Sequence, residues 1–248
     1  MASVTSAPVA AATAIVALDV ESADAALVLT RRLGASCGFY KVGNELFTAA
    51  GPEVVRALRD EGHDIFLDLK LHDIPNTVRG AARSAARLGV KLLTVHASGG
   101  SEMMRAAVEG AEASCGILGV TVLTSFDASG IGAAWGRRDT VILSEEVLRL
   151  ADHAAAAGAH GIVCSGEEVT LVRERFGARL APLVPGIRFA EGASHDQRRV
   201  VTPESAVLGG ARYLVLGRAV TSAADPVAAM VRVRAAMAAA GASAGTRA

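Results

Sequence analysis

Short apolar segments rich in β-branched residues alternate with alanine-rich segments of helical spacing along nearly the whole chain of 248 residues. The segments predicted as strands are 14–18, 37–43, 64–70, 90–96, 116–123, 159–163, 181–184 and 212–216. The segments predicted as helices are 22–33, 52–61, 77–88, 101–113, 144–157, 166–176 and 225–240. Eight strands alternating with helices over about 250 residues are typical of a (β/α)8 TIM barrel. A doubly wound open sheet is the alternative, but no GxGxxG motif, expected in its dinucleotide-binding form, follows the first strand.

The composition indicates a single domain. Apolar residues make up 51% of the chain, enough to bury one substantial core and too many for a disordered protein. No linker, low-complexity segment or shift in composition divides the sequence. We therefore expect a barrel domain over 13–240, between a loose N-terminus at 1–12 and a loose C-terminus at 241–248.

Charge and cysteine content exclude several classes of protein. The 25 Lys+Arg residues balance 25 Asp+Glu, and a net charge of zero argues against a general nucleic-acid binder. Cys37, Cys115 and Cys164 are widely spaced and form no CxxC pair, so neither a disulfide framework nor a zinc site is indicated. The first 18 residues lack the basic region of a signal peptide, and no segment is apolar enough to span a bilayer. We expect a soluble, cytoplasmic protein that contacts neither nucleic acid nor membrane.

The strongest local signal for chemistry lies at the end of the third predicted strand. Side chains alternate along a strand, so Asp68 and Lys70 share one face. Together with Lys41 on the neighbouring strand and Asp73 just past the strand end, they predict an alternating array of two acids and two bases. A structural ion pair is one alternative. Another is a Mg²⁺ site, which the lysine between the two carboxylates disfavours.

Lysine is scarce in this chain, which makes its positions informative. Only Lys41, Lys70 and Lys91 are lysines, against 22 arginines. Two of the three lie inside the predicted charge array. Arginine does not give up its proton at ordinary pH and has a broad planar head group, so lysine and arginine are not interchangeable at these two positions. Lys91 is expected at the surface or at the start of a strand.

Two segments near the C-terminus predict a phosphate site. PGIR at 185–188 follows the seventh strand and GR at 217–218 follows the eighth, where TIM barrels often bind phosphate through backbone N–H groups. Their arginines can add forked, charge-assisted contacts. The alternative is that they are surface charges beside turn glycines. The polar segment 189–199 is predicted as a lid, with Gln197 able to reach the ligand, or else as an ordinary surface loop.

Three further strand ends carry polar residues. Asp19 ends the first strand, His96 ends the fourth, and Thr124-Ser125 follow the fifth. His96 has two open interpretations, a substrate contact or a buried histidine bonded to a carbonyl. The other histidines lack metal-ligand spacing and HExxH is absent, so no metal site is predicted.

Several motifs in the same order resemble the orotidine 5′-phosphate decarboxylase family in its compact bacterial form. They are FYKVGNELF at 39–47, FLDLKLHDIPNT at 66–77, VHASGG at 95–100, LTS at 123–125, PGIR at 185–188, DQRRVVTP at 196–203 and VLGR at 215–218. The DxKxxD core alone is shared with related sugar-phosphate enzymes, whereas its extension through HDIPNT, joined to PGIR and DQxR, is specific to the decarboxylases.

The resemblance implies a homodimeric (β/α)8 barrel that converts orotidine 5′-phosphate to UMP, the last step of de novo pyrimidine nucleotide synthesis, without metal or organic cofactor. Lys70 would protonate C6 after CO₂ has left, and Asp68 would lie beside the substrate carboxylate. Lys41 would contact Asp68 and a ribose hydroxyl. Asp73 and Thr77 would reach into the neighbouring subunit's site.

The resemblance also implies the residues that bind substrate. Asp19 would bind the ribose, Thr124 or Ser125 the pyrimidine, and Pro185 would form a wall of its pocket, while the phosphate would be held by Arg188, Gln197, Gly217 and Arg218. Two other functions stay open. One is a metal-assisted sugar-phosphate enzyme similar to the hexulose-phosphate synthase group, and the other is a non-catalytic barrel that senses UMP.

Overall fold

The strands form one closed barrel. The computed structural model describes residues 11–189 and 201–245, and all eight strands in this part of the chain are parallel. Each pairs with the next in sequence, and β8 pairs with β1, with Val215 opposite Ile15. The strands are β1 (Thr13–Ala17), β2 (Phe39–Gly43), β3 (Asp64–Leu71), β4 (Leu92–His96), β5 (Gly116–Val120), β6 (Gly161–Val163), β7 (Ala181–Val184) and β8 (Tyr213–Leu216). The β1–β8 pairing confirms the predicted TIM barrel and rules out the open sheet.

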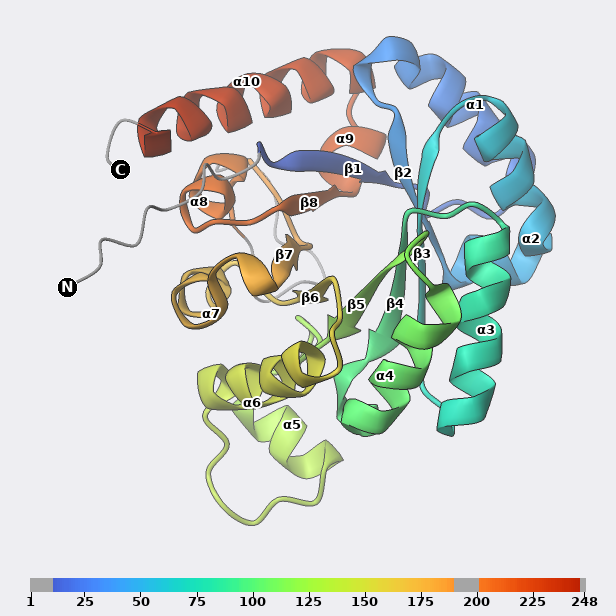
Figure 1. The fold of residues 1–248 in the computed structure, drawn as a ribbon. Helices are drawn as coiled ribbons and strands as arrows, with labels where there is room; N and C mark the ends of the chain where they lie inside the picture. Colours follow the sequence, from blue (N-terminus) through green and yellow to red (C-terminus); the bar gives the residue numbers. More distant parts are fainter. Residues whose placement is uncertain (1–10, 190–200, 246–248) are drawn as a thin grey trace.

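Helices surround the barrel as a ring (Figure 1). They are α1 (Ala23–Leu33), α2 (Asn44–Asp60), α3 (Pro75–Arg87), α4 (Gly100–Ala111), α5 (Ala128–Ala134), α6 (Leu143–Ala156), α7 (Val169–Phe176), α8 (Pro203–Leu208), α9 (Arg218–Thr221) and α10 (Pro226–Gly245). The predicted helices are all present. The sequence missed α5, α8 and α9, because they are too short to show a helical period.

Two predicted helix boundaries differ more from the structure than the others do. α2 begins at Asn44 and not at 52, because the chain is helical on both sides of a kink at Gly51, whose φ is 62°. Pro52 then starts the second part, where its missing N–H costs no hydrogen bond. α10 continues to Gly245, so the predicted domain boundary at 240 falls inside a helix that alanine, a strong helix former, extends. Of the predicted loose N-terminus, 1–12, only the last two residues are described.

The core has two layers. Inside the barrel, Phe66, Leu118 and Tyr213 pack with other inward-facing residues. A larger cluster, which includes Tyr40, Leu93 and Met104, fills the space between the strands and the helices. Because both faces of the strands are buried, their sequences are nearly continuous apolar segments. No helix in the described part of the chain is long and apolar enough to cross a membrane.

Candidate active site

A cavity of about 260 Å³ opens at the carboxyl ends of the strands. This is the face on which TIM barrels carry their active sites. Most of the predicted site residues line it: Asp19, Lys41, Asp68, Lys70, Thr124, Pro185, Arg188, Gly217 and Arg218. Since they come from six different strands or the loops that follow them, barrel closure is what brings them together.

Asp68 lies between the two lysines. Both of its carboxylate oxygens accept hydrogen bonds from Lys70 Nζ at 2.9 Å, and its Oδ2 lies 3.8 Å from Lys41 Nζ. Lys41 Nζ donates a shorter hydrogen bond, 2.8 Å, to Asp19 Oδ1. The side chains of Asp68 and Lys41 are only 13% and 12% exposed, so water screens their interaction poorly. The observed array is therefore Asp19–Lys41–Asp68–Lys70.

Asp73 does not join this array in the described chain. It is exposed, and its Oδ1 accepts a hydrogen bond of 2.6 Å from the backbone N–H of Ile74. Within the described chain Asp73 forms no hydrogen bond or ion pair with Asp68, Lys41 or Lys70, and its place in the charge array stays a prediction. Asp73 lies between the end of β3 and the start of α3, and within the described chain Lys41 bonds the carboxylate of Asp19.

The backbone around Lys70 is unusual. Lys70 has a φ of 50°, in the left-handed region that residues other than glycine rarely adopt. The pairing of β3 with β4 also shifts register between Leu67 and Leu71. A bulge of this kind redirects a side chain, and strained residues of this kind cluster at active sites. In this conformation the Lys70 ammonium is bonded to Asp68.

Thr94 on β4 is a polar residue of this site that the sequence analysis missed. It is fully buried, and its hydroxyl donates to Asp68 Oδ1 and accepts from the Lys70 backbone N–H, both at 2.9 Å. One available signal is its position two residues before His96, since alternation places both on the same face of the strand. A threonine within an apolar strand is otherwise unremarkable, which is why it did not stand out.

Gly43, at the end of β2, leaves room for the Lys41 ammonium. A β-carbon built on Gly43 would lie 2.9 Å from Lys41 Nζ. A side chain at this position would require the flexible end of Lys41 to shift, which would disturb its contacts with Asp19 and Asp68. Glycine is therefore favoured here by close approach and not by an unusual backbone angle.

The opposite side of the cavity is suited to an anion. Arg188 is 8% exposed, and its Nε is buried without a hydrogen-bond partner among the described residues. Burial lowers the pKa of Arg188, and the nearby charge of Arg218 lowers it further. A buried guanidinium whose Nε has no partner among the described residues is suited to binding an anion, because a charged donor out of water is stabilised by a negatively charged partner.

The backbone of Arg188 is hydrogen-bonded to a residue just past the other end of the predicted lid. Its N–H donates to the carbonyl of Val201 at 3.0 Å, and Ile187 forms a parallel bridge with Val201. The predicted lid, 189–199, and with it Gln197, lies outside the described residues except for Phe189. The residues on either side of the predicted lid are thus bonded to each other, and one of them is Arg188, which lines the cavity.

Apolar side chains form the remaining wall of the cavity. Pro185 was predicted from the sequence, but the other apolar lining residues were not: Phe66, Val120, Val122, Val163, Leu183 and Val215. Strand alternation is the signal that would have found several of them, because Phe66 precedes Asp68 by two residues. An apolar wall beside a cluster of charges provides a low-dielectric surrounding that strengthens electrostatic contacts.

Other predicted site residues lie outside the cavity lining. Thr77 is exposed on α3, near Asp73, and Ser125 lies beside the lining residue Thr124. His96 is half-buried, with its ring centroid 5.6 Å from that of His72. Burial lowers the pKa of His96, and the charges of His72 and Lys70 lower it further, which favours a neutral imidazole beside the Lys70 ammonium.

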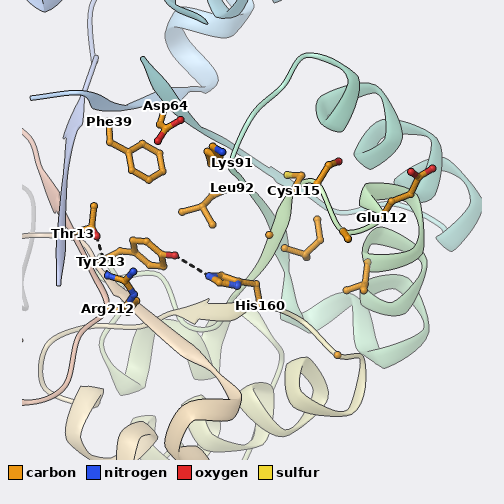
Figure 2. Close-up of a pocket in the computed structure, with 16 residues that line it drawn as sticks. Thr13, Phe39, Asp64, Lys91, Leu92, Glu112, Cys115, His160, Arg212 and Tyr213 are labelled. Carbon is orange, nitrogen blue, oxygen red and sulfur yellow. Dashed lines mark hydrogen bonds between the residues drawn. The ribbon is translucent and has the colours of Figure 1, made fainter. Parts of the chain in front are cut away.

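A larger cavity, about 650 Å³, opens at the opposite mouth of the barrel (Figure 2). The first residues of several strands line it, including Asp64 and Tyr213. Tyr213 points toward His160, and the phenol oxygen lies 3.0 Å from His160 Nε2. Lys91, the third lysine, is exposed at this mouth, as expected for a residue at the start of a strand. No group of three His, Cys, Asp or Glu side chains in the described residues could hold a metal ion at either mouth.

Comparison with known proteins identifies the family. The model of the orotidine 5′-phosphate decarboxylase / HUMPS family matches residues 13–233. The chain belongs to this family. It is 49% identical over 233 residues to an orotidine 5′-phosphate decarboxylase of Halorhodospira halophila, with 92% of this chain and 96% of that protein covered. It is also 49% identical over 236 residues to the decarboxylase of Nitratidesulfovibrio vulgaris, with 91% and 97% covered.

Solved structures of the family agree with the fold. The decarboxylase structure from Lactobacillus acidophilus superposes with a TM-score of 0.80 at 36% identity, covering 91% of this chain and 99% of that chain. The decarboxylase from Pyrococcus horikoshii gives a TM-score of 0.74 at 25% identity, with the same coverage. The relatives named as orotidine 5′-phosphate decarboxylases are carboxy-lyases. This chain is an enzyme of the same kind.

Proposed function

We propose that this enzyme decarboxylates orotidine 5′-phosphate to UMP, the last step of de novo pyrimidine nucleotide synthesis, without metal or organic cofactor. The observation that carries the proposal is the Lys70 ammonium, bonded to both oxygens of Asp68 at one side of a cavity. The other side holds the buried Arg188 Nε, which has no hydrogen-bond partner within 11–189 and 201–245. A substrate with a reacting carboxylate at one end and a phosphate at the other matches this distribution of charge.

The proposed chemistry has two parts. The bond between C6 and the carboxylate carbon breaks, CO₂ leaves, and the electron pair stays on C6. A proton then moves from Lys70 Nζ to C6, and the lysine recovers a proton from water. The carbanion has no conjugated group to share its charge, so preorganised electrostatics must supply most of the barrier lowering, of the order of 8–23 kcal/mol for enzymes in general.

Asp68 and Lys41 have supporting roles in this proposal. Asp68 lies next to the substrate carboxylate, and the repulsion between the two is relieved when neutral CO₂ forms. Asp68 also fixes the Lys70 ammonium by bonding it through both oxygens. Lys41, which bridges Asp19 and Asp68, offers its remaining hydrogen-bonding capacity to a ribose hydroxyl, and Asp19 accepts from the ribose.

Substrate binding is assigned to the rest of the lining. Thr124 or its neighbour Ser125 contacts the pyrimidine, against a wall formed by Pro185 and the apolar side chains. Phosphate is bound by Arg188 and by Gly217-Arg218, with Gln197 added as the family resemblance implies. Phosphate contacts far from C6 can be used to stabilise the transition state, because binding energy there holds the reacting end in place.

The proposed active form is a homodimer. Asp73 and Thr77 are exposed at the start of α3, and Ile74 between them is 67% exposed although it is large and apolar. In a dimer this isoleucine would be covered by the partner subunit, which removes its apolar surface from water. In this arrangement Asp73 and Thr77 reach the neighbouring subunit's cavity, and Asp73 completes the charge array there.

A direct assay tests the proposed function. Purified enzyme treated with EDTA should remove the absorbance of orotidine 5′-phosphate and release UMP at an undiminished rate. Turnover of a keto-sugar phosphate that depends on added Mg²⁺, without turnover of orotidine 5′-phosphate, would assign the chain to the HUMPS branch of the family. Binding of UMP without any turnover would favour a sensor.

A further inference from the structure

We propose that Thr94 is a positioning residue for the decarboxylation, and that its hydroxyl sets the relative geometry of Asp68 and Lys70. The role rests on the proposed function. Thr94 does not line the cavity, so it acts through its two hydrogen-bond partners and not by touching substrate.

The direction of both hydrogen bonds follows from their chemistry. The Lys70 backbone N–H can only donate, so Thr94 Oγ1 must accept that bond. The hydroxyl proton is then free to point at Asp68 Oδ1, an acceptor, at 2.9 Å. One hydroxyl thus ties the carboxylate of Asp68 to the main chain of Lys70 with no ambiguity in its orientation.

The irregularity of β3 creates the need for this hydroxyl. The register with β4 is interrupted between Leu67 and Leu71, so the Lys70 N–H takes a side-chain acceptor in place of a backbone carbonyl. Without Thr94 that N–H would lose its bond in a poorly hydrated place, and the φ of 50° at Lys70 would lose a restraint. Either change would let the Lys70 side chain move relative to Asp68.

The bond to Asp68 has a second consequence. Asp68 Oδ1 receives both the Lys70 ammonium and the Thr94 hydroxyl, whereas Oδ2 faces Lys70 and Lys41. The hydroxyl therefore resists rotation of the carboxylate about its Cβ–Cγ bond. A carboxylate that must repel a substrate carboxylate and hold a proton donor at the same time gains from such a restraint, because small misplacements cost large factors in rate.

Three variants separate this role from simple core stability. Thr94→Val has nearly the shape of threonine but no hydroxyl, and Thr94→Ser keeps the hydroxyl. Thr30→Val is the matched control, since Thr30 is also fully buried and its hydroxyl donates at 3.0 Å to the Leu27 carbonyl in α1, away from the cavity. For each variant, kcat and KM for orotidine 5′-phosphate, Kd for UMP and the melting temperature are measured.

We expect Thr94→Val to lower kcat by about 10- to 100-fold while Kd for UMP changes less than about threefold. Thr94→Ser should retain at least about a third of the wild-type kcat, and Thr30→Val should keep wild-type kcat even if it melts earlier. If Thr94→Val does not fold, Thr94→Cys, with a weaker donor of similar size, should show an intermediate loss of kcat.

The outcomes are distinguishable. A wild-type kcat in Thr94→Val, or in Thr94→Cys where that variant is used, would overturn the role of Thr94 and leave the proposed function intact. So would a loss of kcat in Thr94→Ser equal to that in the hydroxyl-free variant. A wild-type enzyme that leaves orotidine 5′-phosphate unchanged would overturn the proposed function, and the role of Thr94 with it.

Discussion

The two mouths of the barrel are built from the same strands but differ in how they place charge. At the carboxyl ends, Lys41 and Lys70 both contact Asp68 inside a cavity of about 260 Å³. At the amino ends a larger cavity, about 650 Å³, has Tyr213 and His160 joined by a hydrogen bond. The size of a cavity is thus a poor guide to chemistry here, whereas partly buried charges in mutual contact are a good one.

The sharpest test of this difference compares the lysines of the two mouths. Lys70→Ala removes the proposed proton donor and should lower kcat by about four orders of magnitude or more. Lys91→Ala removes an exposed lysine at the opposite mouth and should leave kcat within about twofold. Steady-state kinetics on both variants, with circular dichroism to check folding, gives the comparison. Substantial activity in Lys70→Ala would contradict the assignment of Lys70 as the acid.

Arginines allow a second comparison across the barrel. Arg188→Ala should weaken binding of UMP by about 100-fold or more and binding of uridine by less than about threefold, because only UMP carries the phosphate. Arg212, at the other mouth, donates to Thr13 Oγ1 and lies over the Tyr213 ring at 5.2 Å. Arg212→Ala should cost about 1 kcal/mol of unfolding free energy without changing UMP affinity.

Calorimetric titration with UMP and with uridine, and urea unfolding, measure these effects. Equal weakening of UMP and uridine by Arg188→Ala would remove the phosphate role from Arg188. A loss of UMP affinity in Arg212→Ala would show that the two mouths are not independent.

The smallest expected effect concerns pH and the amino-terminal mouth. Burial lowers the pKa of His160, and the charge of Arg212 lowers it further. The unfolded chain, whose histidines titrate near about pH 6.5, therefore binds more protons than the folded chain at and below that pH. His160 thus stabilises the fold fully above about pH 6.5, and this contribution is lost as the pH falls through the lowered folded pKa.

His160→Gln should therefore make the unfolding free energy less dependent on pH between about 7 and 5, by about 1 kcal/mol or less. Urea unfolding at several pH values measures the slope, and kcat at pH 7 should not change. His96 also has a lowered pKa, so part of the slope should remain. A slope identical to that of the wild type would exclude His160 as a contributor.

The sequence predicted the parts of this molecule that depend on local pattern. The eight strands and the shared face of Asp68 and Lys70 follow from periodicity, and barrel closure then brings Arg188 to the same cavity. The family motifs added the residue roles, which remain predictions. What the sequence could not supply were contacts that depend on irregular backbone or on spatial competition between neighbours.

Three residues illustrate that limit. The φ of Lys70 and the register shift beside it have no signature in the sequence, so the bonds made by Thr94 could not be anticipated. Lys41 was expected on Asp68, but its shorter contact is with Asp19, because two carboxylates compete for one ammonium. The two distances from Lys41 Nζ, 2.8 Å to Asp19 and 3.8 Å to Asp68, depend on how the neighbouring strands are placed, which the sequence does not reveal.

The bridge between Ile187 and Val201 has a consequence for how this enzyme can vary among its relatives. The chain that leaves β7 and the chain that enters α8 are hydrogen-bonded to each other here, so the number of residues between Ile187 and Val201 does not set the distance between these two points. Insertions or deletions between 189 and 200 can therefore change the length of the protein without moving β7 against β8, and loop-closure entropy penalises them only weakly. The same two hydrogen-bonded points keep Arg188 in place whatever that length becomes.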